Sequence, residues 1–216
     1  MDPERFSREL PTLFEDFPAS EHPRDRRFAE VLEAVPGLAR ENNLALVNFA
    51  ASLLDPGECY LEAGTYHGTS LVAAMLGNDG KEFVAIDDFS MGDGSREQLE
   101  ANLARFGLSG AEILEGDVRE VLSGDALSGK RVGVYYYDDG HSYEQHLDGL
   151  RLVEPYLAER ALLIVDDSDW EQVERAVADY LAGQPRARRL LQIDGKDRGQ
   201  PQWWEGVVAL DWNAGD

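Results

Sequence analysis

The residues best suited to chemistry are acidic side chains at the ends of two strand-like segments. The run YYYDDGHSY places Asp138 after one apolar segment, and LLIVDDSDW places Asp166 and Asp167 after another. Carboxylates that face each other without a cation repel and raise one another's pKa. Because Mg²⁺ prefers oxygen ligands, we expect Asp138, Asp166 and Asp167 to hold a divalent ion. The alternative is that Asp167 or Ser168 caps the following helix.

A histidine stands beside these acids. His141 follows Asp138 by three residues, in the segment DDGH. An imidazole in this position is suited to act as a general base near neutral pH, so His141 and Asp138 are the predicted catalytic residues. The alternative is a loop histidine that only holds a turn.

A glycine-rich turn precedes the acids in the chain. The stretch YLEAGTYHGTS runs from an apolar segment ending at Glu62, through Gly64 and Gly68, into a segment with helical periodicity. A strand, a glycine turn and a helix N-terminus in this order place backbone N–H groups where a polar ligand group can bind. Gly64 permits backbone conformations closed to other residues, and Gly68 permits close approach of a ligand. The alternative is a turn that only connects strand to helix.

A further acid ends the next strand-like segment, EFVAID. Asp87 follows the glycine turn by about twenty residues, the spacing at which an acid can accept hydrogen bonds from ribose hydroxyls. The alternative is a solvated loop acid beside Asp88.

Strand-like and helical segments alternate after residue 55. The expected strands are residues 59–62, 82–87, 112–115, 131–138, 161–166, 189–193 and 206–210. This alternation predicts one α/β domain of Rossmann-like, doubly wound architecture, with a mostly parallel seven-stranded sheet and helices on both faces. The last two strands lack an intervening helix, so one strand of this C-terminal hairpin should run antiparallel. Residues 1–54 are expected to be a loosely structured lead-in and a helical cap, and residues 55–216 the domain proper.

Together these motifs resemble class I S-adenosylmethionine (SAM)-dependent methyltransferases. EAGTYHGTS is similar to the glycine turn of the catechol O-methyltransferase-like group. DDGHSYEQHLDGL, followed by VDD, is similar to a bacterial branch that includes macrocin O-methyltransferase-like enzymes. The resemblance extends over residues 43–170. It implies methyl transfer from SAM to a small-molecule acceptor, at a hydroxyl oxygen, with S-adenosylhomocysteine (SAH) as the other product.

The resemblance also implies roles for individual residues. It puts the SAM methionine near the glycine turn, the ribose on Asp87, and the adenine near Asp117 and Val118. The full set of implied SAM-binding residues is Glu62, Gly64, Thr65, Tyr66, Gly68, Ser70, Asp87, Asp117, Val118 and Asp138. The family's metal ligands fall on Asp138, Asp166 and Asp167.

Two positions depart from the family pattern. Asp167 stands where an asparagine is usual, and His141 replaces the catalytic lysine of the catechol-type enzymes. The lysine change bears on the catechol substrate more than on the fold or the cofactor.

Composition excludes some classes of partner. The net charge of −22 opposes binding to nucleic acid or to an anionic membrane, because both require a basic surface. The N-terminal residues show no secretion signal, no apolar run approaches ~18 residues, and the single cysteine, Cys59, forms no internal disulfide. A cytoplasmic protein is therefore expected.

Two other functions compete with methyl transfer. An NAD(P)-dependent oxidoreductase would share the strand, turn and helix, but the chain lacks G-x-G-x-x-G. A non-catalytic SAM- or nucleotide-binding module would not need His141 or the paired acids. Substrate selection is expected from the first forty residues and from the loops 90–95 and 196–204. The N-terminal helices could cap the site of their own chain or reach a second copy in a homodimer.

Overall fold

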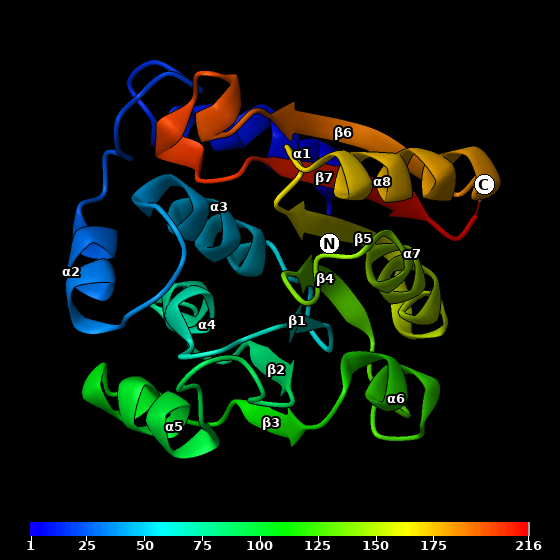
Figure 1. The fold of residues 1–216 in the computed structure, drawn as a ribbon, viewed down its shortest axis with the longest axis horizontal. Helices are drawn as coiled ribbons and strands as arrows, with labels where there is room; N and C mark the ends of the chain where they lie inside the picture. The colour runs from blue at the N-terminus through cyan, green and yellow to red at the C-terminus, as the bar shows by residue number, and fades with distance from the viewer. Residues whose placement is uncertain (216) are drawn as a thin grey trace.

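The computed structural model describes residues 1–215 and contains a seven-stranded sheet in the order β3-β2-β1-β4-β5-β7-β6 (Figure 1). The strands are β1 Cys59–Ala63, β2 Glu82–Asp87, β3 Glu112–Glu115, β4 Val132–Tyr137, β5 Leu157–Asp166, β6 Ala187–Ile193 and β7 Val207–Asn213. The α-helices are α1 Pro3–Glu9, α2 Arg27–Ala34, α3 Glu41–Ser52, α4 Thr69–Met75, α5 Arg96–Arg105, α6 Val118–Ser123, α7 Tyr143–Leu152 and α8 Glu171–Gly183.

The strand directions confirm the predicted doubly wound sheet. β1 pairs in parallel with both β2 and β4, and the parallel pairing continues to β3 on one side and β5 on the other. β7 is antiparallel to β5 and to β6, and it lies between them. The chain winds outward from β1 and returns to β4, so the carboxyl ends of these two strands form the switch point where such folds bind ligands.

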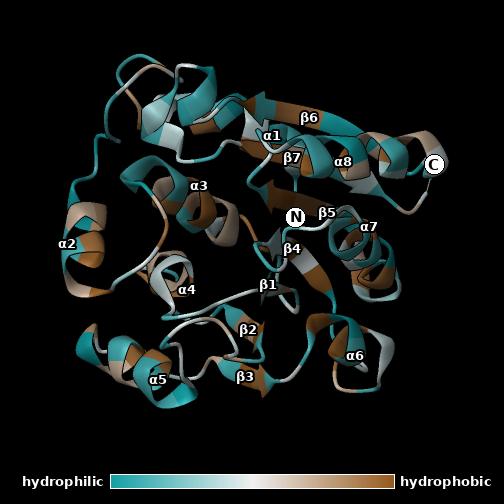
Figure 2. Cartoon of the chain, in the orientation of Figure 1, coloured by the Kyte–Doolittle hydropathy of each residue, from teal (hydrophilic) through white to brown (hydrophobic). Residues whose placement is uncertain are grey.

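Side chains of each central strand alternate between two cores. Tyr60 and Tyr136 face the core under α3, α4 and α5, whereas Leu61 and Tyr135 face the core under α6, α7 and α8. All four are buried. This period-two alternation is why strands that are apolar throughout are covered by helices on both faces. Figure 2 shows the hydrophobic strands between helices whose outer surfaces are largely hydrophilic.

The N-terminal segment is more ordered than its proline content predicts. Asp2 caps α1, and the 3₁₀ turn η1 (Leu10–Leu13) continues it. Phe6 and Leu10 are fully buried in the α3 side of the core, and α1 lies against β5, β6 and β7. α2 and α3 pack beside α4, so residues 1–54 complete the helical layer on that face of the sheet. Among residues 1–215, no helix has the length and apolar character needed to cross a membrane.

Candidate methyl-transfer site

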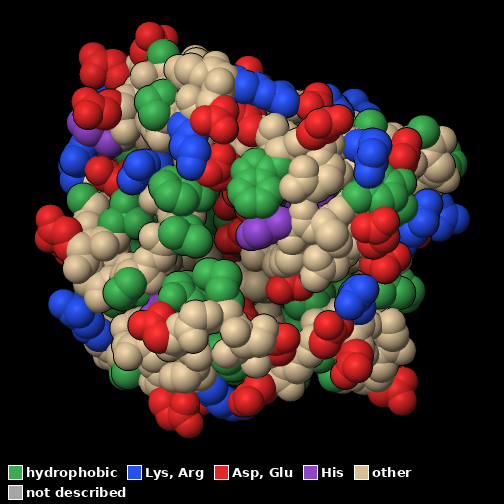
Figure 3. Space-filling view, viewed as in Figure 1, with side chains coloured by type: hydrophobic (Ala, Val, Ile, Leu, Met, Phe, Trp, Pro, Cys, Tyr) green, Lys and Arg blue, Asp and Glu red, His purple; other side chains and the backbone are tan. Residues whose placement is uncertain are grey.

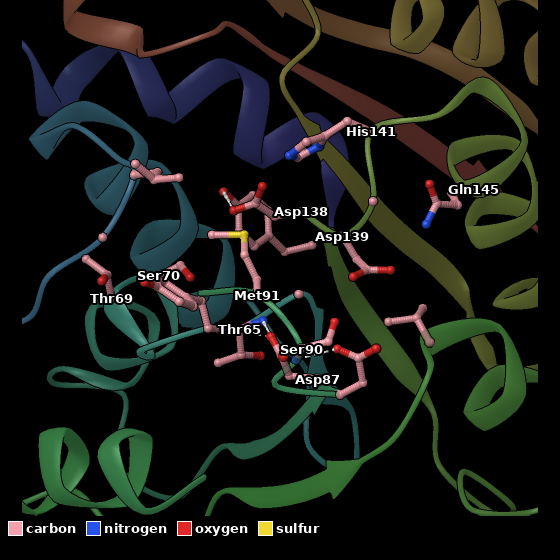
Figure 4. Close-up of a pocket in the computed structure, with 18 of the residues that line it drawn as sticks. Thr65, Thr69, Ser70, Asp87, Ser90, Met91, Asp138, Asp139, His141 and Gln145 are labelled. Carbon is pink, nitrogen blue, oxygen red and sulfur yellow. Dashed lines mark hydrogen bonds between the residues drawn. The ribbon is translucent and has the colours of Figure 1, made fainter. Parts of the chain in front are cut away.

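A cavity of about 300 Å³ opens at the carboxyl ends of β1, β2 and β4. Its walls come from the loop between α2 and α3, the glycine turn after β1, the loop after β2, the start of α6 and the segment after β4. Figure 3 shows a recess on this face, with acidic and histidine side chains at its edge. Figure 4 shows Asp138, Asp139 and His141 entering it from the segment after β4, opposite Thr65 and Ser70.

The glycine turn adopts backbone conformations that glycine favours. Gly64 and Gly68 have φ values of +82° and +85°, and Tyr66 between them has φ +49°. A Cβ atom on Gly64 would overlap the carbonyl oxygen of Asp138, which belongs to the neighbouring strand's end. Glycine is therefore required at position 64 both for its φ angle and for the close approach of two backbones.

Asp87 holds the glycine turn in place. Its Oδ2 accepts hydrogen bonds from the backbone N–H groups of Thr65 and Tyr66, both at 2.6 Å, and its Oδ1 accepts from the N–H of Phe89 at 2.6 Å. A carboxylate has about four acceptor positions, so roughly one is left for a ligand. The sequence predicted that the N–H groups of the turn face a ligand, but Asp87 already occupies two of them.

Glu62 is a buried carboxyl that holds a cavity residue in place. Its side chain is fully buried and accepts hydrogen bonds from Tyr60 at 2.7 Å and from the Ser70 hydroxyl at 2.8 Å. Burial raises the pKa of Glu62 to about 7. Ser70 lines the cavity and Glu62 does not, so Glu62 positions the serine that a ligand would contact.

Tyr136 links two of the acids at the end of the sheet. Its hydroxyl donates to Asp166 Oδ2 at 2.6 Å and lies 3.5 Å from Asp138 Oδ2. Burial, with the charges of Asp166 and Asp167, raises the pKa of Asp138 well above its usual range. Burial and Asp167 raise the pKa of Asp166 to about 8. Asp138 and Tyr136 line the cavity, whereas Asp166 does not.

His141 pairs with Asp167. The imidazole Nδ1 lies 3.3 Å from Asp167 Oδ2, and the ring packs edge-on against Trp170 at 4.7 Å between centroids. Asp167 is buried and has φ +55°, an uncommon backbone conformation for aspartate outside turns. Burial raises the pKa of its carboxyl, and His141 opposes that rise. His141 itself is exposed on the cavity wall, so the nitrogen not held by Asp167 is available to a ligand.

The three acids predicted to bind a metal do not form a metal site as they stand. The Tyr136 hydroxyl donates a hydrogen bond to the Asp166 carboxylate, and the His141 imidazole lies against the Asp167 carboxylate. Within residues 1–215, no three His, Cys, Asp or Glu side chains have an arrangement that would hold an ion. One buried oxygen of Asp166, Oδ1, has no hydrogen-bond partner. The residues present therefore do not fit a divalent ion in this arrangement.

Comparison with known proteins gives the family. Residues 61–168 match a family model described as a methyltransferase domain, which is half of the chain. The chain belongs to this methyltransferase family. The match covers the glycine turn, Asp87 and the segment from Asp138 to Asp167, and it confirms the resemblance to class I methyltransferases. A sequence search of curated proteins finds no significant match.

Solved structures share the methyltransferase fold over nearly their whole length. A protein from Corynebacterium glutamicum is 14% identical, with 98% of each chain covered and a TM-score of 0.68. The O-methyltransferase TomG from Streptomyces achromogenes, solved with SAM, is 17% identical, with 99% of this chain and 100% of TomG covered and a TM-score of 0.66. An O-methyltransferase from Bacillus cereus, solved with SAH, is 14% identical, with 96% of each covered and a TM-score of 0.63. At these identities the likeness establishes the fold.

The methyltransferase's cavity brings most of the predicted cofactor residues together. Gly64, Thr65, Tyr66, Ser70, Asp87, Asp117, Val118 and Asp138 all line it. Gly68 lies outside the lining and is the N-cap residue of α4. Asp117 also caps α6 by accepting from the N–H groups of Arg119 and Glu120. Neither Asp167 nor Ser168 caps α8, whose N-cap Trp170 makes no side-chain capping bond.

Several cavity residues were not individually predicted. Leu38 and Met91 lie on the wall, in two of the three segments expected to select the substrate. Gln145 reaches the wall from the first turn of α7. The third segment, residues 196–204, does not reach the cavity. Trp203 is fully buried against Phe14 and Phe17, with its indole N–H donating to the carbonyl of Pro18. The sequence alone does not show whether the adjacent residues Trp203 and Trp204 lie in the core or at a pocket.

Proposed function

We propose that this methyltransferase transfers the methyl group of SAM to a hydroxyl oxygen of a small-molecule acceptor, with His141 as the general base. The observation that carries the proposal is the pairing of His141 Nδ1 with the buried Asp167 at the cavity wall, 3.3 Å apart. The negative charge of the nearby Asp167 carboxylate favours the tautomer with its proton on Nδ1. Nε2 is then the unprotonated nitrogen and can accept a proton from an acceptor hydroxyl.

The assignment of SAM follows from the family and from the position of the cavity. Related folds hold SAM in TomG and SAH in the Bacillus cereus enzyme. We assign the methionine portion to Ser70 and the glycine turn, and the ribose to the remaining acceptor position of Asp87. The adenine is assigned to the region of Asp117 and Val118, where α6 begins beside the cavity.

The reaction is a direct displacement at the methyl carbon. An oxygen lone pair of the acceptor attacks the methyl group as the bond between that carbon and the sulfonium sulfur breaks. The bonding electrons return to sulfur, which becomes the neutral thioether of SAH. The hydroxyl proton moves to Nε2 of His141 and then to water. Alignment of the two ligands in one cavity supplies much of the rate enhancement, and the base supplies a further part.

A divalent ion at Asp138, Asp166 and Asp167 stays a prediction. Dialysis against EDTA, followed by assay with and without Mg²⁺, tests it. Activity lost on chelation and restored by Mg²⁺ would mean that Tyr136 and His141 move away from these carboxylates when the ion binds. Unchanged activity would leave His141 and Asp167 as the groups that handle the proton.

Calorimetric titration with SAM, SAH and NADH tests the cofactor. We expect SAM and SAH to bind and NADH not to bind. Binding of NADH without SAM would overturn the proposal in favour of the oxidoreductase alternative. SAM binding with no transfer to any hydroxylated acceptor would favour the non-catalytic module. The His141→Ala variant should then bind SAM as the unaltered chain does and also transfer no methyl group.

A further inference from the structure

The mouth of the cavity carries two exposed apolar side chains. Among residues 1–215, Leu38 and Met91 are the large hydrophobic residues with exposed side chains, at 58% and 49% exposure. Both line the cavity, and they come from different loops, one between α2 and α3 and one after β2. Figure 4 shows the Met91 side chain reaching over the cavity toward Asp138. Large apolar side chains gathered at a cavity mouth are typical of a surface that a ligand covers.

The interior of the same cavity is strongly acidic. Five carboxyl groups line it, and within the described residues no lysine or arginine does. The five are Asp87, Asp88, Asp117, Asp138 and Asp139. SAM brings one net positive charge, which offsets only part of this field.

The cationic side chains near the cavity already have partners. Arg119 lies 3.7 Å from Asp117, and Lys196 pairs with Glu205. The guanidinium of Arg40 lies over the ring of Trp204, 5.1 Å from its centroid. Recognition of a further phosphate or carboxylate, beyond the methionine carboxylate of SAM, is favoured by free cationic donors such as arginine or lysine. No such donor faces the cavity from the part of the chain that the structure describes.

We propose that the methyl acceptor is a hydroxy compound that carries no anionic group and has an apolar face, which Leu38 and Met91 cover. Acceptors attached to a phosphate, a nucleotide or coenzyme A are then rejected by the acidic wall. This inference rests on the proposed methyl transfer and adds the acceptor class. The two apolar side chains select the acceptor's body, and the four carboxyls other than Asp138 select its charge.

Three probes with one ring and different charges test the inference. They are 2-(3,4-dihydroxyphenyl)ethylamine, 2-(3,4-dihydroxyphenyl)ethanol and 3,4-dihydroxyphenylacetate, which are cationic, neutral and anionic. Their affinity for the SAH-bound protein is measured by calorimetry, and their methylation by product formation. We expect the anion to bind at least about tenfold more weakly than the neutral probe, and the difference to shrink at high salt because screening weakens charge repulsion.

Variants separate the two parts of the inference. The double change Leu38→Ser with Met91→Ser should weaken the neutral probe about tenfold, since each side chain loses apolar contact, while SAH affinity is kept. Asp139→Asn should narrow the gap between the neutral and anionic probes. Leu108→Ser, at a half-buried leucine outside the cavity, is the control. It should change neither the affinity for the neutral probe nor the gap between the neutral and anionic probes.

Failure of the acceptor inference can be told apart from failure of the proposed methyl transfer. Failure of SAH to bind would defeat the methyl-transfer proposal itself. With SAH bound, the acceptor inference is overturned if the anion binds as well as the neutral probe, if no probe binds, or if the double serine variant keeps full affinity. Weak anion binding, together with loss of the neutral probe in the double variant, supports it.

Discussion

The imidazole of His141 lies with Nδ1 3.3 Å from Oδ2 of Asp167, a buried aspartate in a left-handed backbone conformation. The two residues come from different segments, one after β4 and one after β5. An uncommon φ angle is tolerated where the surrounding structure requires it, and such residues concentrate at functional sites. The Asp167 carboxylate lies against the histidine at the cavity wall.

Replacing His141, the proposed base, tests this pairing. We expect His141→Gln to lower kcat by about 10²-fold to 10⁴-fold, because the acceptor hydroxyl loses its proton acceptor. SAH affinity, measured by calorimetry, should stay the same. Asp167→Asn should lower kcat by about tenfold or more, because its amide no longer fixes the imidazole tautomer. A histidine variant with normal kcat would remove His141 from the mechanism.

Glycine 64 is predicted to be irreplaceable by alanine. The added Cβ would overlap the Asp138 carbonyl and would sit on a residue with φ +82°, so we expect a loss of about 3 kcal/mol or more in unfolding free energy. Gly80→Ala is the matched control, because its φ is +79° but nothing lies within 4 Å of the added atom. The control should cost about 1–2 kcal/mol, from backbone strain alone. Urea unfolding of both variants measures the difference. Equal losses would contradict the predicted overlap.

The free energy of unfolding of the ligand-free protein should fall as the pH rises through the pKa of Glu62. Burial raises the pKa of Glu62 from 4.5 to about 7 in the folded state, so the folded protein binds the proton more tightly than the unfolded chain. The stabilising contribution of Glu62 to the free energy of unfolding is complete below its unfolded-state pKa and is lost as the pH rises through 7. Its upper limit is about 3 kcal/mol. Urea unfolding at pH 5 and pH 8 should show this decline, and Glu62→Gln should reduce it. The exposed Glu115→Gln serves as the control, and a decline unaffected by Glu62→Gln would refute the assignment.

The loop that carries Met91 should loosen when Asp93 is replaced. Asp93 Oδ1 accepts a hydrogen bond from the Tyr66 hydroxyl at 2.7 Å and contacts His67 Nε2 at 3.1 Å, which ties residues 90–95 to the glycine turn. Asp93→Ala removes both contacts. We expect faster amide hydrogen exchange over residues 90–95 and a several-fold weaker affinity for SAH, since each exposed bond contributes about 1 kcal/mol or less. Exchange identical to that of the unaltered protein would show that the loop is held by other contacts.

The sheet could be predicted from sequence because its signals are local. Apolar runs such as that ending at Tyr137 mark buried strands, and the missing helix between β6 and β7 correctly indicated an antiparallel strand. Ser95 likewise caps α5 through a local contact, its side chain accepting from the N–H of Gln98. These features depend on residues close together in the chain.

The parts of the site that were missed depend on approaches between distant segments. Leu38 reaches the cavity because α2 and α3 pack beside α4, which no local pattern encodes. The acid at position 87 was predicted from its spacing, but its hydrogen bonds to Thr65 and Tyr66 require the fold of the turn. The position of Tyr136 between Asp138 and Asp166 likewise follows from strand register rather than from residue type.

The place of β7 has a consequence for biosynthesis. Val207–Asn213 lies between two strands made earlier, and it completes hydrogen bonding for the facing edges of both β5 and β6. While the ribosome is still adding these residues, the growing chain exposes an unpaired, apolar edge of β5, the kind of edge that invites pairing with other chains. Protection of nascent chains against aggregation therefore depends on how soon this strand leaves the exit tunnel and inserts.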